Sequence, residues 1–371
     1  MLAVAEISRS CHPASWRYTH SVNRLSIALL LAAPVAALLG AAPPAKSLDI
    51  YTIDVEGGKS VLVVSPSGES MLIDVGWPSS ANRDASTEVI VDAVKKSGLK
   101  QIDYLVLSHF DVDHMGDVPA LASRLPIRHL VDHGEIQLPS ASPELPVRFS
   151  TYAALRKTMD HTVVRPGDKI PLKGVGVEVV AAGGRLLTKP LKEGGAQNPL
   201  CAANQQAAAI ERDVEDNQSI GLLITFGSFR MLDLADLEAH YNRELVCPAN
   251  LIGQVDVYHV NVHGQFKGMA PELVGALGPT VAIMGNGARK GGDPSTWPML
   301  RAAPGLNDIW QVHYSELGAA DTNPPADFIA NLQAPTDDHR LIKLSVLADG
   351  TYTVTNTRNG FSKTYHATRA R

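Results

Sequence analysis

The stretch Ser108-His109-Phe110-Asp111-Val112-Asp113-His114-Met115-Gly116-Asp117 follows directly after a compact apolar run that begins at Tyr104. It places His109, Asp111, Asp113 and His114 within six residues, and all four side chains are of metal-ligand types. Alternate residues of an extended loop point to one side, whereas neighbours diverge by about 100° once a helix begins. The loop can therefore serve two ions, with His109 and Asp111 on one and Asp113 and His114 on the other. A solvated acidic turn with two incidental histidines is the alternative.

Around this loop, short apolar runs alternate with amphipathic segments. Strands are predicted at 49–55, 60–65, 69–75, 104–108, 129–132, 175–182, 219–226, 229–235, 254–260, 280–284, 341–346 and 351–356, and helices at 86–97, 117–125, 148–159 and 271–277. The stretch 183–218 shows no regular spacing of apolar residues, which is typical of a long loop that is functional or mobile. The pair Asp349-Gly350 is typical of a hairpin turn. The order predicts a layered α/β domain with mixed sheets.

The amino terminus has the features of an export signal. Arginines at 9, 17 and 24 precede the apolar run Leu25–Ala42, which ends in small residues. The run has about the minimum length for a membrane span and contains Pro34, so an uncleaved anchor and a buried core helix are the alternatives. We predict a signal peptide over 1–42 and a protein exported to the periplasm or the extracellular space. Since the segment carries three arginines and one glutamate, its removal changes the formal net charge from −5 to −7.

Composition narrows the function classes. With 371 residues, of which 45% are hydrophobic, the chain is long enough for one large or two modest domains with a real core. The acidic charge and the 5% aromatic content argue against binding long nucleic acid. After export only Cys201 and Cys247 remain, either as a disulfide or as two unrelated buried thiols. Neither lies in a pattern typical of a thiol enzyme, and the sequence has no nucleophile elbow or phosphate-binding P-loop.

At the level of whole motifs, the loop at 108–117 resembles the signature of the metallo-β-lactamase superfamily, usually His-x-His-x-Asp-His. Its Asp111 variant resembles the subgroup that includes the nuclease-like domain of the competence protein ComEC. Further stretches agree in order over roughly 48–315: Leu72–Gly76, Asp216–Ser219, Leu232–Asp236 and His263-Gly264. The resemblance implies a four-layered αββα sandwich over 48–335, with 336–371 as a C-terminal β-hairpin that packs on the same domain.

The resemblance also implies a set of site residues. The metal ligands would be His109, Asp111, Asp113, His114, His133, Asp236 and His263, with Asp74 and Asn217 supporting them from behind. The family commonly has Gly before the bridging aspartate, and here Ala235 stands there, so Asp233 is a rival of Asp236. Val262 replaces the first histidine of the subgroup's His-His-Gly, which leaves His263 as the ligand and His259 as a weaker candidate. His133 is the candidate for the third ligand of the first ion. Its alternative role is that of a histidine in a capped turn.

The implied cofactors are two divalent metal ions. Zinc is the default, while manganese or iron are alternatives because Asp111 replaces an imidazole by a harder, charged ligand. The implied chemistry is hydrolysis by a metal-bridged hydroxide, with Asp111 and Asp113 as the catalytic residues that orient it or accept its proton.

The expected substrate is a small molecule or a short anionic compound with a phosphodiester or ester-type bond. Asn286 and Lys290 lie in a turn rich in glycine and basic residues and are candidates for holding an anionic group, unless the turn is only solvated. Contact with a membrane is expected only if the signal stays uncleaved, and the oligomeric state stays open. The alternative function is a non-catalytic or weakly active binding protein on the same fold, suggested by Val262 and by the uncertain third ligand.

Overall fold

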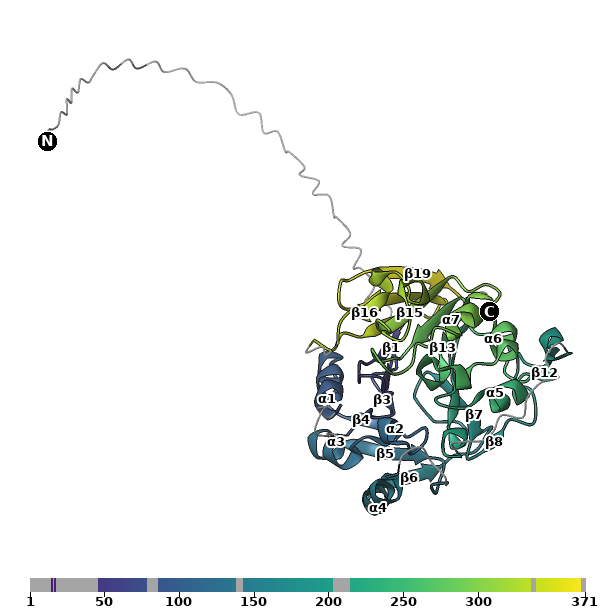
Figure 1. The fold of residues 1–371 in the computed structure, drawn as a ribbon. Coiled ribbons are helices and arrows are strands. Elements are labelled where there is room, and N and C mark those ends of the chain that lie inside the picture. The colour runs from purple at the N-terminus through teal and green to yellow at the C-terminus, as the bar shows by residue number, and fades with distance from the viewer. Residues whose placement is uncertain are drawn as a thin grey trace, which may run out of the picture. The chain divides into compact units, whose positions relative to one another are not determined.

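Two β-sheets face each other in the computed structural model, which describes residues 15, 17, 46–78, 86–137, 143–202, 214–334 and 338–367. The first sheet has the strand order β19-β18-β17-β1-β2-β3-β4-β5-β6, and the second has the order β16-β15-β14-β13-β11-β10-β7-β8 (Figure 1). The first sheet comprises β1 Leu48–Thr52, β2 Val61–Val64, β3 Ser70–Ile73, β4 Ile102–Val106, β5 Ile127–Asp132, β6 Asp160–Val163, β17 Ile342–Val346, β18 Thr351–Asn356 and β19 Ser362–His366.

The second sheet is built from the middle of the chain. It comprises β7 Gly176–Ala182, β8 Arg185–Leu186, β10 Gly221–Phe226, β11 Phe229–Asp233, β13 Val257–His259, β14 Val281–Met284, β15 Asp308–His313 and β16 Ile329–Asn331, while β9 Ala196–Gln197 pairs separately with β12 Ala249–Asn250. The helices are α1 Thr87–Lys96, α2 Val112–Met115, α3 Val118–Arg124, α4 Leu145–Arg156, α5 Ala239–Glu244, α6 Pro271–Leu277 and α7 Thr296–Arg301.

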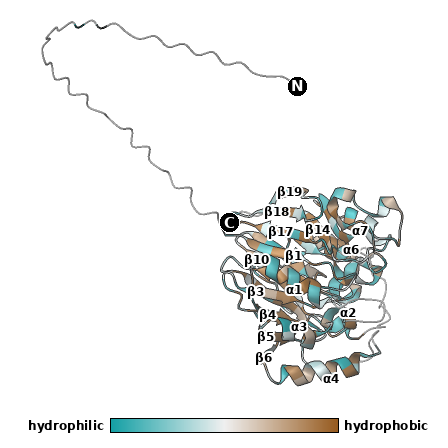
Figure 2. Ribbon diagram, turned by 90° about the vertical axis from the view of Figure 1, so that its left-hand side faces the viewer, coloured by the Kyte–Doolittle hydropathy of each residue, from teal (hydrophilic) through white to brown (hydrophobic). Residues whose placement is uncertain are grey.

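The buried apolar residues form three layers. One layer lies between the sheets and joins residues such as Ile50 of β1 and Met231 of β11. A second covers the outer face of the first sheet under α1, α3 and α4, and a third covers the second sheet under α5, α6 and α7. In Figure 2 the hydrophobic colour lies on the strands and on parts of the helices. This arrangement is the αββα sandwich predicted from the sequence, because each sheet buries one face on the other sheet and one on helices.

Each sheet contains a run of parallel strands that reaches one of its edges, and these strands carry the loops with the predicted ligands. In the first sheet β3, β4, β5 and β6 run parallel, and in the second β11, β13, β14, β15 and β16 do. Loops at the carboxyl ends of parallel strands commonly form ligand sites in α/β proteins. The residues after β4, β5, β11 and β13 carry the predicted ligands.

The C-terminal strands extend the first sheet. β17 pairs with β1 in antiparallel register, β18 pairs with β17, and β19 adds a third strand beyond the two that the sequence indicated. The excursion at 183–218 contains β8, β9 and Cys201, which forms a disulfide with Cys247. The two cysteines are therefore paired and are not separate buried thiols.

The predicted signal peptide at 1–42 lies outside the described residues, apart from residues 15 and 17. In the part of the chain that the structure describes, no helix has both the length and the apolar character needed to span a membrane.

Candidate metal centre

The ligand loop changes from extended to helical backbone between Asp111 and Val112. Asp111 has extended backbone angles and caps α2, which begins at Val112. His109 and Asp111 therefore project from extended chain, whereas Asp113 and His114 project from the first turn of the helix. All four side chains are buried. The local backbone geometry therefore directs His109 and Asp111 to one position and Asp113 and His114 to a neighbouring one.

One group of donors consists of Asp113, His114 and His263. His263 Nε2 lies 3.2 Å from Asp113 Oδ2 and 3.2 Å from His114 Nε2. Asp236 adjoins the same group, since its Oδ1 lies 3.4 Å from His114 Nε2 and its Oδ2 lies 3.3 Å from His263 Nε2. The loop after β4 and the loops after β11 and β13 therefore meet at one point.

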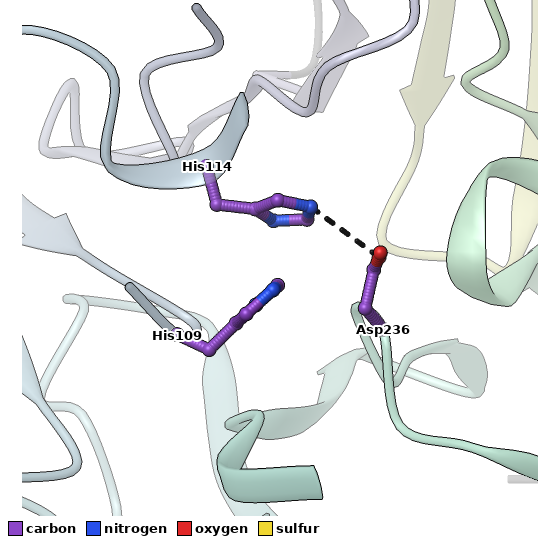
Figure 3. A group of neighbouring side chains, drawn as sticks. All are labelled: His109, His114 and Asp236. Atoms are coloured by element: carbon purple, nitrogen blue, oxygen red, sulfur yellow. Dashed lines mark ion pairs between the residues drawn. The ribbon is translucent and has the colours of Figure 1, made fainter. Parts of the chain in front are cut away.

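A second group of donors consists of His109, Asp111 and Asp216. His109 Nε2 lies 3.5 Å from Asp216 Oδ1 and 4.0 Å from Asp111 Oδ2. Asp236 reaches this side too, because it forms a further group with His109 and His114, as Figure 3 shows. Asp236 therefore adjoins both groups, which is the position of a bridging ligand.

The distances between donors match a shared cation. Four ligand atoms at about 2.1 Å from one tetrahedral ion lie about 3.4 Å from each other. The separations among Asp113, His114, Asp236 and His263 are 3.2 to 3.5 Å, longer than most hydrogen bonds yet close to this spacing.

The imidazole tautomers give a second argument for a cation. His114 Nδ1 lies 2.9 Å from Asp74 Oδ2, and His263 Nδ1 lies 3.2 Å from the carbonyl oxygen of Gly285. Each Nδ1 faces an acceptor, so in the neutral form each imidazole carries its proton there and presents the lone pair of its Nε2 to the centre. Two lone pairs 3.2 Å apart repel each other unless positive charge lies beside them.

His109 provides a third argument. Its side chain is fully buried, and its Nε2 has no hydrogen-bond partner although two carboxylates face it. A buried nitrogen without a partner costs free energy, about 1–3 kcal/mol in typical cases. The residues present therefore fit divalent cations in both groups, although the donor set does not by itself decide which metal binds.

Asp74 holds the ligand loop from behind. Its Oδ1 accepts a hydrogen bond from the backbone N–H of Ser108 at 2.7 Å, and its Oδ2 accepts from Ser108 Oγ at 2.6 Å. The same Oδ2 faces His114 Nδ1, so one buried carboxylate orients both the loop backbone and a ligand imidazole.

Asn217 lies behind the loop after β11. Its Nδ2 donates to Glu238 Oε2 at 3.1 Å, and its Oδ1 accepts from the Glu238 backbone N–H. Ser219 adds a contact that the sequence did not predict, because its Oγ accepts from the Asp236 backbone N–H and lies 3.4 Å from His109 Nδ1. Both residues thereby hold the backbone of the turn that carries Asp236.

His133 contacts a carboxylate that is not a member of either donor group. Its Nε2 lies 2.9 Å from Glu215 Oε1, and the groups found among the described residues do not include it. Asp216 takes the place that the sequence reasoning offered to His133. The signal was present, since Asp216 begins the stretch 216–219 and precedes a strand, but only Asn217 was singled out from it.

Glu215 is a further residue that sequence reasoning missed. Its buried carboxylate accepts from the backbone N–H groups of Phe110 at 3.0 Å and Gln137 at 2.6 Å, and it also contacts His133. Phe110 lies between two ligand residues, so Glu215 fixes the backbone of the ligand loop. His133 in turn orients Glu215.

The pKa shifts at the centre indicate that its buried carboxylates favour positive charge beside them. Burial raises the pKa of Asp236, but His263 and His114 outweigh it and hold the pKa of that carboxyl well below its usual range. Burial lowers the pKa of His114, but Asp236 and Asp113 raise it well above its usual range. The carboxylates thus stay ionised, and they draw either protons or metal cations to the imidazole nitrogens.

Asp233, the rival of Asp236, lies in a separate environment. Its carboxylate accepts hydrogen bonds from Lys59 Nζ at 2.8 Å through both oxygens, and both side chains are buried. His259 Nδ1 lies 3.3 Å from the same ammonium group. Asp233 already has its counter-ion, so the geometry favours Asp236 as the ligand, and His259 belongs with the Lys59–Asp233 pair.

Asn286 and Lys290 have different surroundings. The buried Asn286 amide donates to the carbonyl oxygens of Gly287 and His313, so its amide hydrogens are taken up by backbone. Lys290 contacts Asp113, and its Nζ lies 4.8 Å from the centre of the Trp77 ring. Lys267, which the sequence did not single out, contacts Asp216 in the same way. Two half-exposed lysines thus border the two donor groups.

Several ligand-bearing turns have unusual backbone. Ala235 has a φ of 50°, and Val262 and His263 have φ values of 49° and 54°. These angles are costly for residues with a Cβ, above all for a β-branched one. A glycine before Asp236 would adopt the angle without cost, which explains why this position favours glycine. Such strain is tolerated where the surrounding structure holds a functional side chain in place.

Comparisons with known proteins agree with this picture. Residues 53–190 match the family model described as the metallo-beta-lactamase superfamily. ComE operon protein 3 from Bacillus subtilis (strain 168) is 24% identical over 252 residues, which are 64% of this chain and 28% of that protein. The chain thus spans less than a third of the length of this curated relative.

Solved structures with similar folds include the metallo-beta-lactamase fold protein YhfI from Bacillus subtilis, which is 12% identical with a TM-score of 0.43 over 71% of this chain and 96% of that chain. A putative metal-dependent hydrolase from Parabacteroides distasonis is 14% identical with a TM-score of 0.39 over 70% of this chain and 92% of that chain. The family model and the curated relative confirm the resemblance predicted from the sequence: the chain has the metallo-β-lactamase fold and is ComEC-like.

Proposed function

We propose that this metallo-β-lactamase-fold protein is an exported hydrolase that uses two divalent metal ions to cleave a phosphodiester or ester-type bond in a small or short anionic substrate. The observation that carries the proposal is the position of Asp236, which adjoins both donor groups at the junction of the two sheets. A carboxylate shared by two ions is typical of centres that bring two cations close together.

The residues divide between the ions as follows. His109, Asp111 and Asp216 would hold one, and Asp113, His114 and His263 would hold the other, with Asp236 between them. Zinc is the preferred occupant because imidazole and carboxylate donors suit it, while the number of carboxylates also allows manganese or iron. When bound, such ions supply Lewis acidity that lowers the pKa of water and stabilises negative charge on the reacting bond.

Asp111 and Asp113 are the proposed catalytic carboxylates. Burial raises the pKa of Asp113, but Lys290 and His114 hold it well below its usual range, so the group stays ionised. Ionised carboxylates next to the reacting centre can orient a water molecule and take up its proton.

The two bordering lysines support an anionic substrate. Lys267 contacts Asp216 and Lys290 contacts Asp113, so each ammonium lies next to a proposed metal ligand. Once a cation neutralises that carboxylate, the lysine becomes available for a phosphate or carboxylate group. The acidic net charge of the chain favours a short substrate over a long nucleic acid.

The test compares the wild type with His114→Ala and Asp236→Asn. We expect about two equivalents of metal at this centre, measured by elemental analysis after reconstitution with Zn²⁺ or Mn²⁺, and a loss of loading in both variants. Hydrolysis of bis(p-nitrophenyl) phosphate, p-nitrophenyl esters and lactones is then measured. His366→Ala, which changes an exposed histidine of β19, is the matched control.

The results distinguish a dinuclear hydrolase from a binding protein on the same fold. Loss of metal and of hydrolysis in both variants, but not in the control, supports the proposal. A metal content near zero in the wild type contradicts the dinuclear centre. Metal binding without hydrolysis across the panel favours the alternative, a binding protein on the same fold.

Export is proposed on separate grounds. The basic and apolar segments of 1–42 are typical of a signal peptide, and the Cys201–Cys247 disulfide suits an oxidising compartment. Residues 1–47 fused to a reporter enzyme that is active only after export should give activity, and replacing the run 25–42 by polar residues should abolish it. Activity that survives this replacement contradicts export through the segment.

A further inference from the structure

A second cluster of metal-ligand side chains lies at the ends of β1 and β15. Asp54 and Glu56 follow β1, His313 ends β15, and His339 precedes β17. Asp54, Glu56 and His339 each offer a ligand atom within 4.8 Å of the others. None of these residues belongs to the donor groups around Asp236.

One oxygen of Asp54 is left for a ligand. The Asp54 side chain is fully buried. Its Oδ1 accepts a hydrogen bond from the Glu56 backbone N–H at 3.0 Å and lies 2.8 Å from His313 Nε2. Its Oδ2 has no hydrogen-bond partner. An ionised oxygen that is buried without a hydrogen bond is costly, so this atom favours a cation beside it and His339.

The direction of Asp54 Oδ2 identifies its neighbours. It lies 3.4 Å from His339 Nδ1, which is the spacing of two ligands on one tetrahedral ion with bonds of about 2.1 Å. His313 contacts the opposite oxygen and would thereby orient Asp54, as residues behind metal ligands commonly do. The side chains of Glu56 and His339 are 27% and 32% exposed, so an ion can enter from solvent.

We propose that Asp54, Glu56 and His339, with His313 orienting Asp54, form a separate site for a divalent transition-metal ion such as Zn²⁺ or Mn²⁺. Two carboxylates and one imidazole are a suitable donor set for these ions. The ligands come from segments next to β1 and β17, which are neighbouring strands of the first sheet, and His313 at the end of β15 links Asp54 to the second sheet. This proposal does not depend on the hydrolase activity.

The experiment measures Zn²⁺ and Mn²⁺ binding to the full chain by equilibrium dialysis and elemental analysis. The variants are His339→Gln and Glu56→Gln, which change partly exposed ligands, and His366→Gln is the matched control. We expect each ligand variant to bind about one equivalent less than the wild type and the control. Circular dichroism spectra confirm that the variants are folded. Asp54→Asn should also lose this equivalent, and the other two variants decide the matter if it does not fold.

A second background separates this site from the centre around Asp236. In Asp236→Asn, the ion held by the Asp54 cluster should remain, and His339→Gln should remove it. Failure of the hydrolase proposal leaves this outcome unchanged. Equal metal content and equal Zn²⁺ affinity in His339→Gln, Glu56→Gln and the control, in both backgrounds, would overturn the proposal, because the cluster would then be held by ion pairs alone.

Discussion

Asp233 and Asp236 are three residues apart at the end of the same strand, yet the structure gives them opposite environments. Asp233 accepts two hydrogen bonds from Lys59 Nζ, an ammonium group that belongs to the chain. Asp236 instead faces the imidazoles of His114 and His263 at 3.4 and 3.3 Å. One carboxylate is neutralised on folding, and the other is placed to recruit a cation from solution. The difference between a structural and a functional acid thus lies in its partner and not in its burial.

The largest expected effect comes from Asp236→Asn. Removal of the charge next to both donor groups should lower kcat/KM on any cleaved substrate about 10³-fold or more, since a two-metal centre contributes several kcal/mol to a transition state. The free energy of unfolding, measured in urea in the presence of a chelator, should change far less than the activity. A variant that retains full metal content and full activity would show that Asp236 is not the bridging ligand.

Asp233→Asn should have the reverse pattern. It leaves the Lys59 ammonium buried without its counter-ion, which should lower the free energy of unfolding by about 3–5 kcal/mol. The Lys59→Met/Asp233→Leu double variant should be less destabilised than the sum of Lys59→Met and Asp233→Leu, because it leaves no unpaired charge. Urea denaturation of the four proteins measures this coupling. Additive effects would mean that the pair does not act as a unit.

The pH dependence of stability should reveal His259. Burial and the neighbouring Lys59 lower the pKa of His259 to about 3, whereas in the unfolded chain it is about 6.5. Between these values the unfolded chain binds a proton that the folded chain does not, so stability is fully present above about pH 6.5 and is lost as the pH falls.

We therefore expect His259→Asn to lose less stability than the wild type between pH 7 and pH 5, as measured by thermal melting at each pH. The variant also distinguishes the surroundings of Asp233 from the centre around Asp236, because the metal content at that centre should stay unchanged. Parallel losses in both proteins would contradict the low pKa.

The smallest expected effect concerns Ala235, the residue that separates the two acids. Because its φ is 50°, Ala235→Gly should raise the free energy of unfolding by about 0.5–1 kcal/mol, while Ala153→Gly within α4 should lower it by a similar amount. Thermal melting of the two variants checks the opposite signs. A destabilised Ala235→Gly would mean that the surrounding contacts, and not the residue, bear the strain.

The fold was predictable because its signals are local. Alternating burial in β1 and β17, and fully buried runs such as β3 and β14, produce patterns that the sequence shows directly. The ligand loop at 108–117 was equally accessible, since four donors lie within six residues after one strand. The third C-terminal strand, β19, was missed because its segment alternates between exposed and half-buried residues and has only one buried position.

The distant half of the centre was harder to predict. The grouping of Asp216 with His109 and Asp111 could not be predicted, because no sequence pattern shows which strand ends meet. Asn286 was assigned to substrate, yet its amide groups are taken up by neighbouring backbone. Glu215 and Lys59 had no sequence signal, since Glu215 acts on Phe110 and Lys59 acts on Asp233, each more than a hundred positions away.

The sequence by itself determined the type of fold, the identity of the first four donors and the need for positive charge beside them, because these depend on spacing and composition. Only the tertiary structure decided that Asp236, and not Asp233, faces the donors, that Asp216 joins His109 and Asp111, and that a separate cluster gathers around Asp54. The physical reason is the same in each case. The partner that neutralises a buried charge comes from another part of the chain, and its arrival is set by how the two sheets pack.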